Sequence, residues 1–290
     1  MSQTTPISTP FVFPSFRWRW RGGFEAAFAS EPGKRQTQNQ DSCLHAPSAQ
    51  APLFCGVADG VGGGAHGEIA SSVFLEHCAQ APRKTVRDSA RLLRWVIAGD
   101  AKVREAIGRL TDRPGAATAA AVWLLGFGKA HLINIGDCRV YRLRPRKSRC
   151  SIDRITLDQT YENVGERHPP SGSPDDPARM VGVDAIGTPS LVAARIREGD
   201  LLLVCSDGVH KHVSDNEIAD AIRVGLSKRL TLREICSVLV RAAKANGGDD
   251  DASALLVLRH AWLGVRSIYW WTLVTAALIW LVSGFAIGVF

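Results

Sequence analysis

The sequence lacks the cysteine spacing that a zinc ribbon or a disulfide framework requires. Its 290 residues include seven cysteines, an odd number, and no two of them form a Cys-x-x-Cys pair. Regular zinc sites and small disulfide-bonded domains depend on such spacing. Cys55 and Cys205 lie inside apolar runs, so we expect them to be small buried hydrophobic residues rather than nucleophiles. A reducing compartment is therefore expected.

The N-terminal residues lack a secretory signal, and the middle of the chain lacks repeats and a Gly/Ser linker. The first residues are rich in Ser, Thr and Pro, and Pro14 interrupts the apolar stretch 11–13 before it reaches the length of a signal sequence. With 46% hydrophobic and 22% charged residues, the composition is that of a globular protein that can bury a sizeable core. We expect residues 1–15 to be disordered and the middle of the chain to fold as one domain.

Four aspartates lie next to apolar runs that are predicted to be strands. They are Asp41, Asp59, Asp207 and Asp250. Buried carboxylates need compensating charge, so side chains at such positions are expected to converge on a cation, on donors or on water. Ligand sets made only of oxygen favour Mg²⁺ or Mn²⁺. Asp-Gly is also a common turn dipeptide, and a turn-forming role is the alternative for each aspartate taken alone.

The segments around these aspartates resemble, in order and spacing, the signature motifs of bacterial-type PP2C (PPM) protein phosphatases. The resemblance covers residues 23–259. It implies an α+β fold, a four-layer α-β-β-α sandwich of two packed antiparallel sheets flanked by helices, with metal ions at one end. The five motif segments are Gly33–Asp41, Val57–Gly63, Ile135–Tyr141, Val204–Gly208 and Gly247–Ser253.

The resemblance also implies a catalytic and metal-binding role for the aspartates. Two Mn²⁺ or Mg²⁺ ions would hold a water that attacks phosphoserine or phosphothreonine in proteins. Asp59 would bridge the ions, and the carbonyl oxygen of Gly60 would be a further ligand. Asp207 and Asp250 would complete the shell of the first ion. Asp41 would hold the pair directly or through water.

Two further positions complete the implied site, and one of them departs from the family pattern. Asp137 resembles the ligand of a third, weaker metal ion. The phosphate-binding arginine of the family is replaced by Gln36. Arg35, one residue earlier, is the candidate to bind phosphate in its place, because a guanidinium is a natural bidentate partner of phosphate.

Three assignments near the motifs have alternatives. Asp249–Asp251 are adjacent, so a one-residue shift would select another ligand, although the strand-like run 252–258 favours Asp250. His66 is either a general acid or, as we favour, a residue at the start of a helix. Asp158 either approaches the site on a flap or caps a loop.

Sequence patterns also predict individual elements. Apolar spacing predicts a helix over 85–110, with Gly99 as its weak point. Two capping boxes, Ser214–Glu217 and Thr231–Glu234, predict later helix starts. Strands and helices are interspersed without the strict β-α alternation of a Rossmann fold. The strand-like runs are 119–125, 131–135 and 201–205.

Residues 268–290 carry no charged side chain. As a helix this run would extend about 34 Å, against a bilayer hydrocarbon core of about 30 Å. Tyr269–Trp271 suit an aromatic belt, and Arg259 and Arg266 suit the cytoplasmic side. We expect a single-pass C-terminal membrane anchor with the catalytic domain in the cytoplasm. The alternative is a buried core helix.

The chain is thus predicted to have four parts: a flexible basic and aromatic segment (1–22), the phosphatase domain (23–259), a juxtamembrane linker (260–267) and a transmembrane helix (268–290). In the first part, 16–21 alternates aromatic and basic residues, as expected for an edge strand or for contact with anionic lipid. The net charge of +7 is not concentrated in a nucleic-acid-binding motif, so no nucleic acid is expected as a partner.

The expected function is metal-dependent hydrolysis of phosphoserine and phosphothreonine in proteins at the cytoplasmic face of a membrane, opposing a Ser/Thr kinase. The main alternative is a non-catalytic phosphoprotein-binding module, a pseudophosphatase, because Gln36 stands in the arginine position. A third class, a membrane scaffold, would act through the basic cluster 142–149 and would leave the aspartates without a role.

Overall fold

The computed structural model describes residues 23–34, 38–46, 53–61, 66–260 and 275. Its strands form two five-stranded sheets, in which neighbouring strands pair antiparallel. The first sheet has the order β1 (Phe24–Glu31), β10 (Ala252–Arg259), β9 (Leu201–Cys205), β6 (Arg139–Pro145) and β7 (Cys150–Arg154). The second sheet has the order β2 (Ser42–Ala46), β3 (Leu53–Gly60), β4 (Ala117–Leu124), β5 (Lys129–Ile135) and β8 (Ser190–Arg195).

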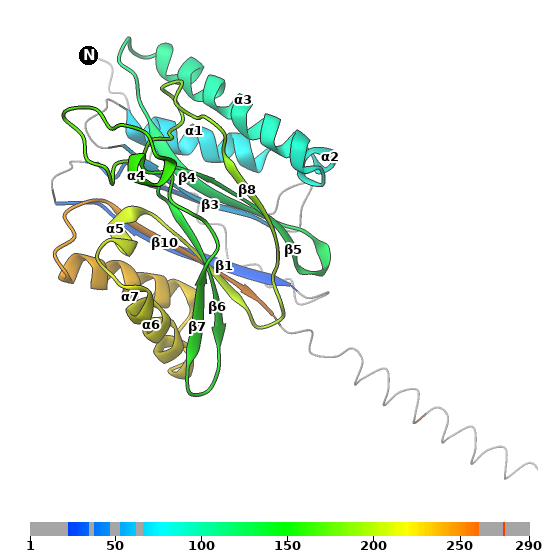
Figure 1. Cartoon of the computed structure of the whole chain (residues 1–290). Helices are drawn as coiled ribbons and strands as arrows, with labels where there is room; N and C mark the ends of the chain where they lie inside the picture. The colour runs from blue at the N-terminus through cyan, green and yellow to red at the C-terminus, as the bar shows by residue number, and fades with distance from the viewer. Residues whose placement is uncertain (1–22, 35–37, 47–52, 62–65, 261–274, 276–290) are drawn as a thin grey trace, which may run out of the picture.

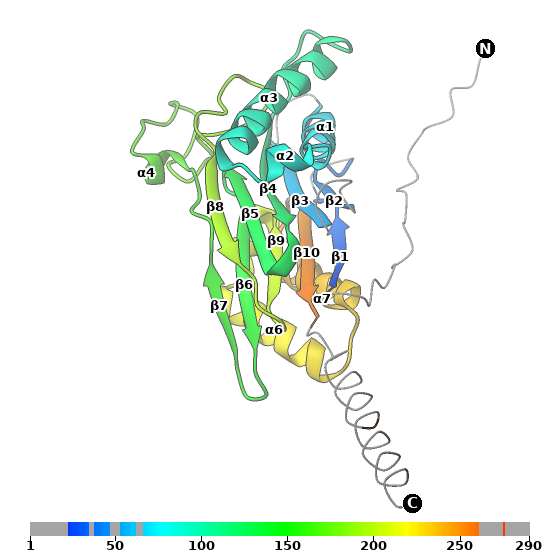
Figure 2. The ribbon, with the colours of Figure 1, turned by 90° about the vertical axis from the view of Figure 1, so that its right-hand side faces the viewer.

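Helices cover the outer face of each sheet (Figure 1). The view in Figure 2 shows the two sheets packed between these helix layers, so the predicted α-β-β-α arrangement is confirmed. Over the second sheet lie α1 (Gly67–Ala79), α2 (Arg83–Val86) and α3 (Ser89–Gly108). Over the first sheet lie α6 (Asp215–Ser227) and α7 (Leu232–Ala245). The short elements are η1 (Gly126–Gly128), α4 (Tyr161–Val164) and α5 (Asp207–His210).

The central strands are apolar on both faces because each lies between a helix layer and the other sheet. In β9, Leu201 and Leu203 pack under α6 and α7, whereas Leu202 and Val204 face the second sheet. This alternation follows from the two-residue period of a strand. Cys205 is buried, as predicted, and all seven cysteines are free thiols.

The expected helix over 85–110 is in fact two helices. Asp88 adopts an extended backbone conformation and its carboxylate accepts a hydrogen bond from the Arg91 amide at 3.0 Å, so α3 begins after Asp88. Gly99 is not a weak point, because a Cβ there would lie 2.9 Å from the Phe74 ring of α1. Both predicted capping boxes are present at the starts of α6 and α7.

The strand register determines which strand ends lie together at each end of the sandwich. Phe24, at the start of β1, pairs with Arg259 at the end of β10, and Glu31 pairs with Ala252 at the opposite end. β9 ends at Cys205, which pairs with Ala254 near the start of β10. The turns that contain the predicted site aspartates therefore lie at the end opposite Phe24 and Arg259.

The predicted membrane helix, 268–290, lies outside the described residues except for residue 275, as does the N-terminal segment 1–22. No helix among the described residues has both the length and the apolar character needed to cross a bilayer. The membrane anchor and the role of the segment 16–21 stay predictions.

Candidate metal centre

The five predicted ligand aspartates occupy strand ends and turns at one end of the sandwich. Asp59 is the penultimate residue of β3, and Asp41 directly precedes β2. Asp207 begins α5, two residues after β9 ends, and Asp137 lies in the turn between β5 and β6. Asp250 lies two residues before β10 begins. Strands from both sheets thus bring these side chains together.

Their carboxyl groups influence one another electrostatically. The pKa of Asp59 lies well above its ordinary value, first because the group is buried and then because Asp41 and Asp207 are negatively charged neighbours. Burial also raises the pKa of Asp41 to about 7, against the lowering effect of hydrogen bonds from Ser253 and Ser206. The pKa of Asp250 is raised by burial and by Asp207. The cluster therefore carries more negative charge than the nearby protein cations compensate.

Unpaired oxygens in this cluster fit metal ligation. Asp41 Oδ1 and Asp207 Oδ1 are buried and have no hydrogen-bond partner among the described residues. Oxygen atoms of this kind suit a hard cation such as Mn²⁺ or Mg²⁺. Asp41 Oδ2 accepts a hydrogen bond from Ser206 Oγ at 2.8 Å. In the described part of the chain, no three His, Cys, Asp or Glu side chains are arranged as a ready metal-binding group.

Gly60, the predicted carbonyl ligand, has a packing role that does not depend on metal. A Cβ at Gly60 would lie 2.6 Å from the carbonyl carbon of Gly67 and 2.8 Å from Gln40 Cβ. Only glycine allows the start of α1 to lie this close to the end of β3. His66 precedes α1 with a φ of 70°, and its Nδ1 lies 3.6 Å from Glu68 Oε1. This is the helix-start position that we favoured for His66.

The structure separates the roles of three adjacent aspartates. The Asp251 side chain is 1% exposed, and its two oxygens accept hydrogen bonds from the amides of Gly33 and Gln40, both at 2.6 Å. Asp249 forms an exposed ion pair with Lys34 at 3.4 Å. Asp250 stays the predicted metal ligand of the three. The structural role of Asp251 was missed by the sequence analysis, because its partners lie more than 200 residues away.

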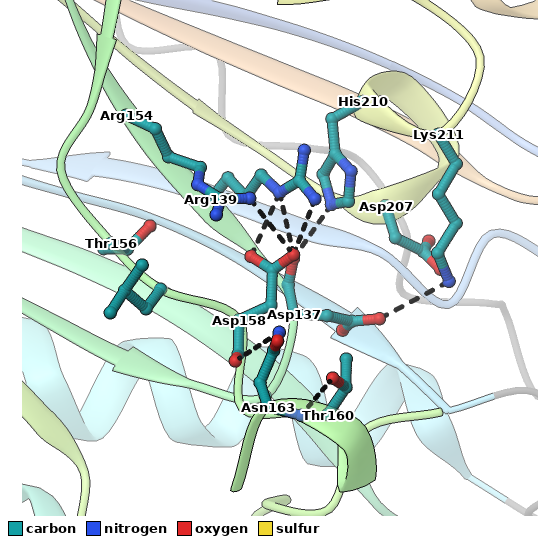
Figure 3. Close-up of polar contacts among 12 residues, drawn as sticks. Asp137, Arg139, Arg154, Thr156, Asp158, Thr160, Asn163, Asp207, His210 and Lys211 are labelled. Carbon is teal, nitrogen blue, oxygen red and sulfur yellow. Dashed lines mark hydrogen bonds and ion pairs between the residues drawn. The ribbon is translucent and has the colours of Figure 1, made fainter. Parts of the chain in front are cut away.

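Lys211 and His210 belong to the site and were also missed. Figure 3 shows Lys211 beside Asp207 and Asp137; its Nζ lies 2.7 Å from Asp207 Oδ2 and 3.6 Å from Asp137 Oδ2. His210 Nε2 donates to the Asp137 carbonyl oxygen at 2.9 Å. Burial lowers the pKa of His210 to about 4, so its ring is neutral near pH 7. The four-residue spacing of Asp207 and Lys211 was the signal in the sequence.

Lys211 also affects the charge state of the two carboxylates. Burial, and after it the negative charge of Asp207, raise the pKa of Asp137 to about 6 against the lowering effect of Lys211. Burial also acts to raise the pKa of Asp207, but Lys211 and a hydrogen bond from Asp59 outweigh it, so the pKa of Asp207 lies below its ordinary value. The pKa values of the neighbouring Asp59 and Asp207 are therefore shifted in opposite directions.

Asp158 has a role that neither interpretation of the sequence contained. Its carboxylate accepts hydrogen bonds from Arg139 Nε at 3.0 Å and from a terminal guanidinium nitrogen of Arg139 at 2.6 Å (Figure 3). Arg154 lies 3.6 Å from the same carboxylate. Asp158 thus joins β6 to the segment that follows β7.

Arg35 and Gln36 lie outside the described residues. The predicted phosphate contact therefore stays a prediction.

Comparison with known proteins identifies the family. Residues 33–246 match the family described as Protein phosphatase 2C. The serine/threonine protein phosphatase PstP of Mycobacterium tuberculosis is 29% identical over 239 residues, which is 79% of this chain and 44% of that protein. This chain therefore spans less than half the length of that relative.

Solved structures share the same fold. PppA of Pseudomonas aeruginosa has a TM-score of 0.64 and 27% identity, with 81% of this chain and 97% of that chain covered. The catalytic domain of PstP in complex with two manganese ions has a TM-score of 0.63 and 26% identity, with 82% and 99% covered. Because the matched residues 33–246 include the strands β2 to β9 and four of the five clustered aspartates, this chain belongs to the protein phosphatase 2C family.

Proposed function

We propose that the protein is a metal-dependent protein serine/threonine phosphatase that binds two Mn²⁺ or Mg²⁺ ions. The observation that carries the proposal is the cluster of buried carboxylates with unpaired oxygens at one end of the PP2C sandwich. The serine/threonine phosphatase activity in the names of its relatives supports it. So do the two manganese ions in the PstP catalytic domain.

The bound ions would supply an activated water and would neutralise charge on the phosphoryl group. The residues of this chain hold and orient the site. Asp59, Asp207 and Asp250 provide carboxylates that repel one another. A divalent ion bound between them would compensate their negative charge and so reduce this repulsion. Ser206 fixes one oxygen of Asp41 and leaves the other for an ion or for its water.

Phosphate capture is proposed for Arg35. This residue lies between Gly33 and Gln40, whose amides both bind the Asp251 carboxylate. One buried side chain therefore fixes both ends of the segment that contains Arg35. The substrates would be proteins phosphorylated on serine or threonine by an opposing Ser/Thr kinase.

We also propose that residues 268–290 attach the protein to a membrane, with the catalytic domain in the cytoplasm. The uncharged run, its aromatic start and the preceding Arg259 and Arg266 support it. Extraction of membranes with sodium carbonate tests this proposal. The full chain should stay in the membrane fraction, and a chain ending at residue 267 should be released.

Gln36 favours one alternative, a pseudophosphatase that binds phosphoproteins without hydrolysing them. A membrane scaffold has less support, because Arg142 and Arg144 both bind Asp153 Oδ2, at 3.0 and 3.1 Å, within the β6–β7 hairpin. Their charge is therefore partly compensated inside the protein.

Phosphate release from a phosphothreonine peptide tests the main proposal. The full chain in detergent should release phosphate with Mn²⁺, and release should stop with EDTA or in Asp207→Asn. Lys102→Ala, a change on the exposed face of α3, is the control and should stay active. Binding of the peptide without phosphate release by a folded, Mn²⁺-loaded protein would favour the pseudophosphatase.

A further inference from the structure

The position of Lys211 bears on how many metal ions the site can bind. Its ammonium contacts the Oδ2 atoms of Asp207 at 2.7 Å and of Asp137 at 3.6 Å. The Asp137 and Asp207 side chains are 5% and 15% exposed, so little water compensates their charge. Asp137 is the residue for which the family resemblance implies a third metal ion. A protein cation stands at that place instead.

The backbone fixes this arrangement on both sides. α5 is a single turn, and the Lys211 amide donates to the Asp207 carbonyl oxygen at 2.9 Å, which places the two side chains on one face. The ring of His210, on the same turn, donates to the Asp137 carbonyl oxygen at 2.9 Å. α5 and the β5–β6 turn are therefore held together, and the Lys211 ammonium lies between their carboxylates.

An ammonium and a divalent ion compete for the same oxygens. A Mg²⁺ ion binds oxygen at about 2.1 Å, so an ion that contacted both Oδ2 atoms would lie within a few ångströms of the lysine nitrogen. Like charges at that separation repel, and the carboxylates that they would share are mostly shielded from water, although the Lys211 side chain itself is 45% exposed.

Other nearby cations are engaged elsewhere. Arg139, labelled beside Asp158 in Figure 3, binds Asp158 through two nitrogens and Tyr141 through a third. Among the described residues, Lys211 is the cation whose ion pairs include Asp137. The Lys211 side chain thus supplies positive charge beside Asp137, where a third ion would otherwise supply it.

We propose that Lys211 takes the place of a third metal ion, so that this protein binds two divalent ions rather than three. The inference rests on the proposed two-metal phosphatase site. It means that the positive charge beside Asp137 is part of the chain and does not vary with the concentration of free metal.

The test is the number of Mn²⁺ ions bound per chain, measured by equilibrium dialysis of the full protein in detergent. The parent should bind two. Lys211→Met, which keeps the length of the side chain but removes its charge, should bind three. The third ion should bind at least about a hundredfold more tightly than in the parent, because a like charge a few ångströms away is removed.

Three controls identify the site of the third ion. Lys102→Ala, which removes an ion-paired lysine from α3, should bind two ions. Lys211→Arg keeps a positive charge and should also bind two. Asp137→Ala combined with Lys211→Met should return the count from three to two. Circular dichroism establishes that each variant is folded.

Each other result overturns the inference in a distinguishable way. A parent that binds three ions, or a folded Lys211→Met that binds two, refutes it and leaves the two-metal proposal intact. A folded Lys211→Met that binds two ions but has lost affinity for inorganic phosphate would show that the lysine is a phosphate ligand instead. A parent that binds no Mn²⁺ refutes the inference together with the proposed function.

Discussion

Asp250 and Asp251 are neighbours in the sequence, yet their replacement should have opposite effects. Asp251 is buried and accepts two backbone hydrogen bonds at 2.6 Å, from Gly33 and Gln40. A hydrogen bond to a charged group contributes about 1.5–3 kcal/mol. Two such bonds amount to roughly 3–6 kcal/mol, and Asp251→Ala also leaves buried amides unpaired. For a domain of this size, that loss lowers the thermal midpoint by roughly 6–20 °C.

Asp250→Ala should leave the fold nearly as stable as the parent and should weaken Mn²⁺ binding. Asp250 is more exposed than Asp251, although its surroundings desolvate the carboxyl group in part, and its Oδ1 accepts a hydrogen bond from the Asp251 amide at 2.9 Å. That bond contributes about 1 kcal/mol. Loss of a metal carboxylate, by contrast, removes the stabilisation that bound Mn²⁺ gives to the folded state, about 2.7 kcal/mol at a hundred times the dissociation constant.

Thermal unfolding of the full chain, followed by circular dichroism with EDTA and with Mn²⁺, separates the two effects. Asp251→Ala should lower the midpoint in EDTA and still gain stability from Mn²⁺. Asp250→Ala should have a midpoint near that of the parent in EDTA and gain little from Mn²⁺. If Asp251→Ala is as stable as the parent but loses the response to Mn²⁺, Asp251 is the ligand and the assignment made here is wrong.

Three further predictions follow from contacts around the site. Gly60→Ala places a Cβ 2.6 Å from the backbone of α1 and should destabilise the domain by about 1–3 kcal/mol, measured by urea unfolding. Gly108→Ala is the control and should leave the stability unchanged, because a Cβ there meets nothing within 4 Å. In EDTA, Asp41 in the folded form keeps its proton up to about pH 7, whereas Asp41 in the unfolded chain loses it near pH 4. The free energy of unfolding should therefore fall as the pH rises from 4 to 7, by at most about 4 kcal/mol. Thermal midpoints across this range measure the fall, which Asp41→Asn should reduce but not abolish, because the pKa values of Asp59 and Asp137 are also raised in the folded form; an equally large fall in the variant would contradict the assignment. Asp158→Ala leaves the guanidinium of Arg139, 19% exposed, without its carboxylate and should lower stability by about 3–5 kcal/mol in chemical denaturation. An unchanged urea midpoint in Asp158→Ala would show that the pair is solvated in solution.

The helices and strands that could be predicted are those determined by residues close together in the sequence. The capping boxes of α6 and α7 each need only four consecutive residues, and both are present. The strand β9 follows from an apolar run that is buried on both faces. The break between α2 and α3 was missed because the apolar spacing continues across Asp88, whose capping bond depends on its own backbone conformation.

The site was predictable where its motifs are local and was not where its contacts are distant. The aspartates meet at one end because antiparallel strands carry their ends there, and the order of the motifs indicated this. The hydrogen bonds between Asp251 and the amides of Gly33 and Gln40 join segments more than 200 residues apart in the sequence, and no local motif indicates them. The pair Arg139–Asp158 likewise depends on how β6 and the segment after β7 pack.

The register of β1 and β10 limits where a substrate can be attacked. β10 has eight residues, so about 26 Å separates its end at Arg259 from its start beside the aspartates. If residues 268–290 anchor the chain as proposed, the aspartates stand at least about that far from the end of the domain to which the anchor is joined. The proposed phosphatase would then act on phosphoserine or phosphothreonine carried on a long extended segment more readily than on residues next to the lipid surface.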